Sequence, residues 1–129
     1  MSGARAPAHL ARLSFEASDE TVRVVLGGET IAESTHTVLV HETGHAPVRY
    51  FPRGDVPMDR LRRTDRATHC PYKGAAAYWT VEAGGRVAPS AAWSYDDPIP
   101  AAAGIGGLIA FYPDCVDAIV TPAKPEPDA

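Results

Sequence analysis

The stretch AAYWTVEAGGRVAPSAAWSY, residues 76–95, decides the fold, because it contains two extended runs joined by a pair of glycines. Aromatic and β-branched residues favour strands, and Gly84-Gly85 is typical of the turn in a short hairpin. Side chains alternate between the two faces of a strand, so Tyr78 and Trp79 are expected to point in opposite directions. The sequence therefore predicts a β-hairpin with one of these two rings in the core.

Further strand signals lie on both sides of this hairpin. The run TVRVVL at 21–26 is joined by Gly27-Gly28 to ETIAES at 29–34, which predicts an earlier hairpin. Three shorter extended runs are HTVLVHE at 36–42, VRYFP at 48–52 and LIAFY at 108–112. The segment DDPIPAAAGIGG at 96–107 predicts one helix, which its glycines keep short. Together these elements predict a mainly-β domain, a small two-sheet sandwich or open barrel with one short helix.

The two ends of the chain lack such signals. Residues 1–16 are rich in Ala and Arg and predict a flexible lead-in or one short helix, and residues 121–129 form a proline-rich tail expected to be disordered. A single β domain over residues 17–120 follows. Within it, RGDVPMDRLRRTDR at 53–66 mixes Arg with Asp and predicts a solvated loop, with an anion-binding loop as the alternative.

Charge and hydropathy limit the classes of partner. A net charge of -4 over 129 residues gives no electrostatic footprint for nucleic acid. The longest apolar stretch, IPAAAGIGGLIAFY, is broken by glycines and too short to span a membrane. The first residues have no apolar run typical of a secretory signal, so a cytoplasmic protein with reduced Cys70 and Cys115 is expected. We expect a small-molecule ligand, no nucleic-acid or membrane partner, and a homodimer only through an exposed sheet edge.

Four motifs give the chain a resemblance to a known family. YFPRGDV, THCPYKGAAAYW, AAWSYDDPIPAAAGI and IAFYPDCVD occur in the order and spacing of domain-of-unknown-function family 427, found in bacteria and fungi, over roughly residues 20–120. The resemblance implies a β-tent-like fold, two small sheets folded over one another, and implies no general activity. Zinc-carrying relatives of this architecture use paired Cys-x-x-Cys ligands, which this chain lacks, so neither a structural zinc nor another cofactor is expected.

The motif THCPYKGAAAYW, residues 68–79, contains the candidate nucleophile. Cys70 is followed three residues later by Lys73 and is preceded by His69, and nearby positive charge favours the reactive thiolate. On an extended strand, however, His69 and Cys70 point to opposite faces and do not meet. The alternative for Cys70 is a small buried hydrophobic residue, whereas Cys115 has no basic neighbour and is expected to be packed or exposed.

A carboxylate and a set of rings complete the predicted site. Glu42 ends an apolar strand and could act as a general acid or base, or could pair with Lys73 or an arginine. His41 and His45 would form a metal pair only on a helix, and their surroundings predict strand and turn, so no metal is expected. The residues expected to bind substrate are Tyr50, Tyr72, Tyr78, Trp93 and Tyr95, with His69 and Arg53. A core built from the same large rings is the alternative.

These candidates are consistent with more than one function. In the first, the chain is a small-molecule enzyme in which Cys70 is the nucleophile, Lys73 stabilises negative charge and Glu42 moves a proton. Its reaction would be hydrolysis or group transfer on a small carbonyl compound. In the second, a non-catalytic module binds a metabolite or a peptide in the same aromatic-lined pocket. In the third, the cluster only packs.

Overall fold

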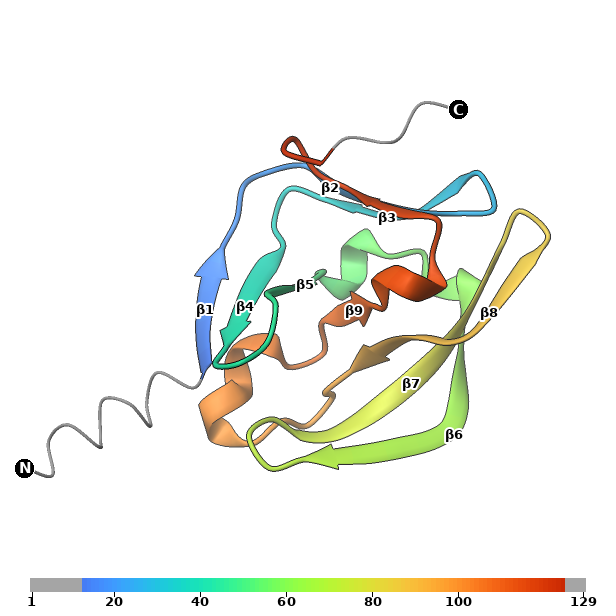
Figure 1. Cartoon of the computed structure of the whole chain (residues 1–129). Coiled ribbons are helices and arrows are strands. Elements are labelled where there is room, and N and C mark those ends of the chain that lie inside the picture. Colours follow the sequence, from blue (N-terminus) through green and yellow to red (C-terminus); the bar gives the residue numbers. More distant parts are fainter. Residues whose placement is uncertain (1–12, 125–129) are drawn as a thin grey trace, which may run out of the picture.

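The computed structural model describes residues 13–124, within which ten strands form three antiparallel sheets (Figure 1). The mainly-β prediction is confirmed, with three small sheets where two were expected. The sheets have the strand orders β1-β4-β5, β10-β2-β3 and β6-β7-β8-β9. The strands are β1 Leu13–Ala17, β2 Val22–Leu26, β3 Glu29–Ser34, β4 Val38–Glu42, β5 Val48–Tyr50, β6 Leu61–Cys70, β7 Gly74–Ala83, β8 Arg86–Ser94, β9 Ile109–Phe111 and β10 Ala118–Val120.

Both predicted hairpins are present, and their glycine turns pack against each other. Gly27, in the β2–β3 turn, has a φ of +61°, and Gly84, in the β7–β8 turn, has a φ of +57°. A Cβ atom added to Gly84 would lie 1.9 Å from the carbonyl oxygen of Gly27. Glycine is therefore required both by the left-handed backbone and by the close approach of the two turns. This contact joins the second sheet to the third.

Strand β7 is buried on both faces and contributes to two separate clusters of buried side chains. Trp79 packs in the larger cluster with Phe51 and Phe111, while Tyr78 packs in a second cluster with Tyr50. Successive side chains of a strand point to opposite faces, which explains why neighbours enter different clusters. The predicted opposite orientation of Tyr78 and Trp79 is confirmed.

The loop predicted for residues 53–66 is wrong in its second half, where strand β6 begins at Leu61. Residues 53–55 and 58–60 form short 3-10 helices, η1 Arg53–Asp55 and η2 Met58–Arg60, but the chain is extended from Leu61 onward and pairs with β7. Most β6 side chains are exposed, and the strand lies at the edge of its sheet. Charged residues are common on edge strands, where they discourage pairing with another chain. A homodimer through such an edge stays a prediction.

The boundaries of the β domain also differ from those expected. Leu13–Ala17 pairs with β4, so the first sheet begins before residue 17. Residues 1–12 and 125–129, which contain most of the predicted lead-in and tail, lie outside the described residues. The predicted helix at 96–107 is a 3-10 helix, η3 Pro100–Ile105, and another, η4 Pro113–Cys115, follows β9. In the described part of the chain, every helix is too short or too polar to cross a bilayer.

Candidate functional site

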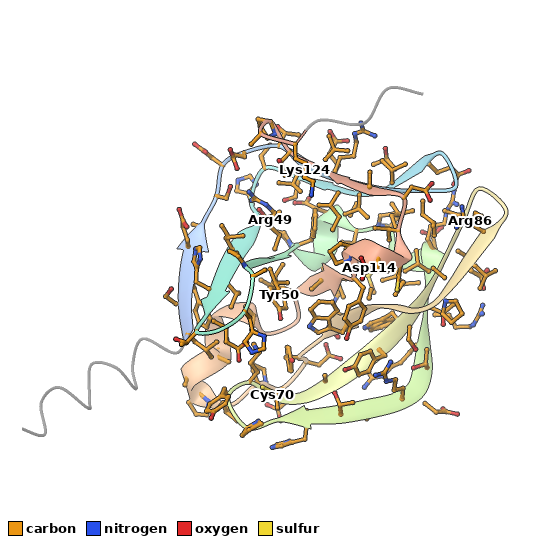
Figure 2. The ribbon with its side chains drawn as sticks, in the orientation of Figure 1. Arg49, Tyr50, Cys70, Arg86, Asp114 and Lys124 are labelled. Carbon is orange, nitrogen blue, oxygen red and sulfur yellow. The ribbon has the colours of Figure 1, made fainter. Side chains whose placement is uncertain are left out.

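A cavity of about 700 Å³ opens between the first and third sheets, and all five tyrosines of the chain line it. We call it the tyrosine cavity. Its aromatic wall consists of Tyr50, Tyr72, Tyr78, Tyr95, Tyr112 and Trp93. Glu42, Cys70, Lys73 and His69 line the same space. Tyr50 comes from β5 and Cys70 from the end of β6 (Figure 2), so the fold joins residues that are distant in the sequence.

The floor of the tyrosine cavity contains a buried ion pair. Lys73 is only 8% exposed, and its Nζ donates a hydrogen bond to Oε1 of Glu42 over 2.5 Å. The backbone N–H of Lys73 donates to the carbonyl of Cys70, and the N–H of Ile99 donates to the carbonyl of Lys73. The lysine is thus fixed by its backbone as well as by its side chain. Of the partners considered for Glu42, the structure pairs it with Lys73.

Cys70 lies where β6 ends, beside this ion pair. Its side chain is half-buried and packs against the cluster that contains Tyr50 and Tyr95, while it also lines the cavity. His69, the preceding residue of the strand, is exposed. Cys115 is exposed as well, in agreement with the sequence analysis. The chain therefore holds one thiol at the cavity wall and a second at the surface.

Hydrogen bonds and ring contacts hold the aromatic wall in place. The indole N–H of Trp93 donates to the hydroxyl of Tyr50 over 3.2 Å, and the ring centres of Trp93 and Tyr112 are 4.3 Å apart. The hydroxyls of Thr68 and Tyr78 are 2.8 Å apart. These contacts fix the rings before any ligand binds, which favours tight binding because little side-chain freedom is lost.

Burial keeps the tyrosine hydroxyls protonated. Burial raises the pKa of Tyr50 to about 12, although the hydrogen bond from Trp93 acts in the opposite direction. Burial, with a smaller contribution from a hydrogen bond with Tyr78, raises the pKa of Tyr112 to about 12. The pKa of Tyr95 is raised further, again chiefly by burial. The neutral hydroxyls can therefore donate hydrogen bonds to oxygen atoms of a ligand at any moderate pH.

We expect alkaline pH to destabilise the domain through these tyrosines. Below about pH 10, the ordinary pKa, both folded and unfolded chains keep the phenolic protons. Between about 10 and 12 the unfolded chain releases protons that folded Tyr50 and Tyr112 retain, so the free energy of unfolding falls as pH rises. Absorbance of tyrosinate measured beside circular dichroism should show these two tyrosines ionising only together with unfolding. Ionisation of all five near pH 10 in the folded state would contradict the burial argument.

Arg53 is the predicted substrate-binding residue that lies outside the tyrosine cavity. Its Nη2 pairs with Oδ1 of Asp96 at 2.7 Å, and its Nε donates to the carbonyl of Gly107. Its guanidinium lies 5.4 Å from the centre of the Trp79 ring. Arg53 thus contacts Trp79 of the third sheet, and the substrate-binding role predicted for it stays a prediction.

Two of the aromatic and titratable side chains that line the cavity, Tyr112 and His45, were not among the predicted site residues. Tyr112 follows β9 and stacks on Trp93, and His45 lies with its Nε2 3.9 Å from Oε2 of Glu42. The sequence contains only five tyrosines, and all five line the tyrosine cavity. Tyr112 could therefore have been predicted by grouping it with the other four. Within residues 13–124, no three His, Cys, Asp or Glu side chains gather closely enough to hold one metal ion.

Fold and cavity together define the class of protein: a small mainly-β domain in which polar-tipped rings and a buried ion pair surround one hollow. The chain belongs to the family described as a domain of unknown function, DUF427, whose family model matches residues 14–122. The resemblance carried by the four sequence motifs is thereby confirmed. No curated protein matches the chain.

Proposed function

We propose that the chain is a small-molecule enzyme that hydrolyses, or transfers a group from, a carbonyl compound in the tyrosine cavity. The observation that carries the proposal is the buried Lys73–Glu42 ion pair, which lines the same cavity as the thiol of Cys70. Burying two charges costs free energy that a purely structural contact between apolar residues would avoid. A nucleophile beside an acid and a base in a cleft is a common arrangement in enzymes.

In the proposed reaction on an ester, the thiolate of Cys70 attacks the carbonyl carbon and a carbon–sulfur bond forms. The carboxylate of Glu42 accepts the thiol proton and passes it to the departing alcohol. The ammonium of Lys73 stabilises the negative charge that develops on the carbonyl oxygen, and the neutral hydroxyls of Tyr50 and Tyr95 donate hydrogen bonds to the substrate. Water then breaks the carbon–sulfur bond, which releases the carboxylic acid and restores the thiol.

Alkylation with iodoacetamide tests the nucleophile. Access alone favours Cys115, because it is exposed and Cys70 is half-buried. Faster labelling of Cys70 at neutral pH can therefore arise only if its surroundings activate the thiol. We expect Cys70 to react about tenfold faster, read by peptide mass spectrometry, and Cys115→Ser to leave its rate unchanged. Equal labelling, or faster labelling of Cys115, would contradict a nucleophilic Cys70.

Turnover of a simple ester tests the reaction. With p-nitrophenyl acetate as probe, Cys70→Ser and Lys73→Met should each lower the release of p-nitrophenol about tenfold or more, equivalent to at least about 1.4 kcal/mol of activation free energy. Cys115→Ser is the matched control and should retain full activity. Circular dichroism of each variant separates lost chemistry from lost folding. Unchanged turnover in a folded Cys70→Ser protein would remove the proposed mechanism.

A non-catalytic binding module is the second candidate, favoured by one specific observation. Several polar groups of the cavity already have partners within the protein: Lys73 binds Glu42, Tyr78 binds Thr68, and Tyr50 accepts from Trp93. Ring stacking would then supply most of the affinity for a flat ligand. Native mass spectrometry of the purified chain, showing a retained small molecule together with unchanged slow alkylation of Cys70, would favour this function.

A further inference from the structure

A second hollow, of about 510 Å³, lies where the three sheets meet. We call it the sheet-junction hollow. It is lined by Leu39 of β4, Val48 of β5, Trp93 of β8, Phe111 of β9 and Ile119 of β10. Four of these side chains are only half-buried, so apolar surface stays in contact with water. Burying such surface under an apolar group is favourable.

Charged side chains stand around the rim of the sheet-junction hollow, and the most enclosed of them already has partners. Figure 2 labels three residues of this lining, Arg49, Asp114 and Lys124. Arg49 donates hydrogen bonds to Ser18, Thr37 and Glu20. Its charge is thus compensated within the protein, and the other cation of the lining, Lys124, is exposed at the rim. Apolar contact is what this hollow chiefly offers.

The sheet-junction hollow adjoins the tyrosine cavity. Pro47, Val48, Trp93 and Pro113 line both spaces. The indole N–H of Trp93 donates its hydrogen bond to Tyr50 in the tyrosine cavity, so the part of the ring that faces the sheet-junction hollow is apolar. A molecule that has one end in the tyrosine cavity can therefore pass over Trp93 and meet a mainly apolar surface.

We infer that the substrate carries an apolar chain, acyl or alkyl, which extends from the tyrosine cavity over Trp93 into the sheet-junction hollow. This inference rests on the proposed function, because it assigns the carbonyl end of the substrate to the tyrosine cavity. A small carbonyl compound alone would leave the half-buried surfaces of Leu39 and Ile119 in water. A chain of several methylenes would cover them.

Binding of carboxylates of increasing length tests this inference without requiring turnover. Acetate, butyrate and octanoate are titrated into the full chain, and isothermal calorimetry and tryptophan fluorescence report binding. Each methylene that enters the hollow should tighten binding by up to about fourfold, the equivalent of about 0.8 kcal/mol. Octanoate is therefore expected to bind at least about tenfold more tightly than butyrate. The p-nitrophenyl esters of the same three acids should show the same order in kcat/KM.

Substitutions that introduce a charge into the hollow test whether the acyl chain of the ligand lies there. Leu39→Asp should reduce the preference for octanoate about tenfold and leave acetate and butyrate binding unchanged. Ile119→Asp should do the same, and Leu39→Asp is the safer variant because Leu39 belongs to neither buried cluster. The matched control is Val87→Asp, an exposed apolar position in β8 outside the hollow, which should bind all three acids as the unmodified chain does.

Three outcomes would overturn the inference. The first is equal affinity for butyrate and octanoate, and the second is an octanoate preference that Leu39→Asp leaves intact. The third is a preference that appears only after residues 125–129 are removed, which would assign the hollow to the chain's own end. If only the proposed function is wrong, the result differs from these three outcomes: the carboxylates show the length preference, but none of the esters is hydrolysed.

Discussion

The Gly84→Ala variant is expected to lose about 3 to 5 kcal/mol of unfolding free energy. Two costs add at this position. The backbone has a φ of +57°, which disfavours any residue with a Cβ atom, and the new methyl would lie 1.9 Å from the carbonyl oxygen of Gly27. The two hairpin turns must therefore separate, which loosens the second sheet from the third. Urea denaturation followed by circular dichroism measures the loss.

Gly85→Ala is the control that separates these two costs. Gly85 also has a positive φ, +76°, but a Cβ atom there would meet nothing within 4 Å. Only the backbone cost of about 1 to 2 kcal/mol is then expected. Losses of equal size in the two variants would show that the contact between the turns contributes nothing beyond backbone conformation.

Glu42→Leu is expected to destabilise the domain by about 3 kcal/mol, because it leaves the ammonium of Lys73 buried without its partner. This value is at the lower end of the range for broken buried pairs, since water in the tyrosine cavity can solvate the remaining charge. Removing both charges in Glu42→Leu/Lys73→Leu should recover most of the loss. Denaturation midpoints of the two single variants and the double variant complete the cycle.

An exposed ion pair with the same separation provides the comparison. Glu29 and Arg60 are also 2.5 Å apart, but their side chains are 45% and 43% exposed, against 16% and 10% for Glu42 and Lys73. Glu29→Leu should therefore change stability by less than about 1 kcal/mol. If Glu42→Leu proved equally mild, the Lys73 charge would be solvated despite its burial, and its proposed role in stabilising an oxyanion would lose its main support.

Strands with a buried face could be predicted from the sequence, and strands without one could not. The hairpin at 76–95 has apolar and aromatic residues flanking a glycine pair, and β7 is buried along most of its length. Its partner β6 lacks the alternation of apolar and polar residues that marks a half-buried strand, because nearly all its side chains face water. Pairing of β6 with β7 is decided by backbone hydrogen bonds, which leave little trace in the sequence. The same reason explains β1, whose side chains are almost all exposed.

The part of the candidate site that comes from neighbouring residues could be predicted from the sequence. Cys70 and Lys73 are joined by a tight turn, so their placement at one cavity followed from the motif itself. The pairing of Lys73 with Glu42 depends on how the first sheet faces the third, which no local pattern encodes. Arg53 lies outside the tyrosine cavity, where Asp96, brought near by the fold, binds its guanidinium. The position of such an arginine cannot be predicted before its carboxylate partner is known.

The alternation of β7 has a consequence for how the domain could diversify. Trp79 and Tyr78 are consecutive residues, yet one belongs to the cluster with Phe51 and Phe111 and the other to the wall of the cavity. Of the β7 residues, Tyr78 lines the cavity, so a substitution there changes the cavity wall while Trp79, on the other face, keeps its place in the core. A library at Tyr78 and its cross-strand neighbour Trp93 would vary the cavity wall while the core on the opposite face of the same strand stays unchanged.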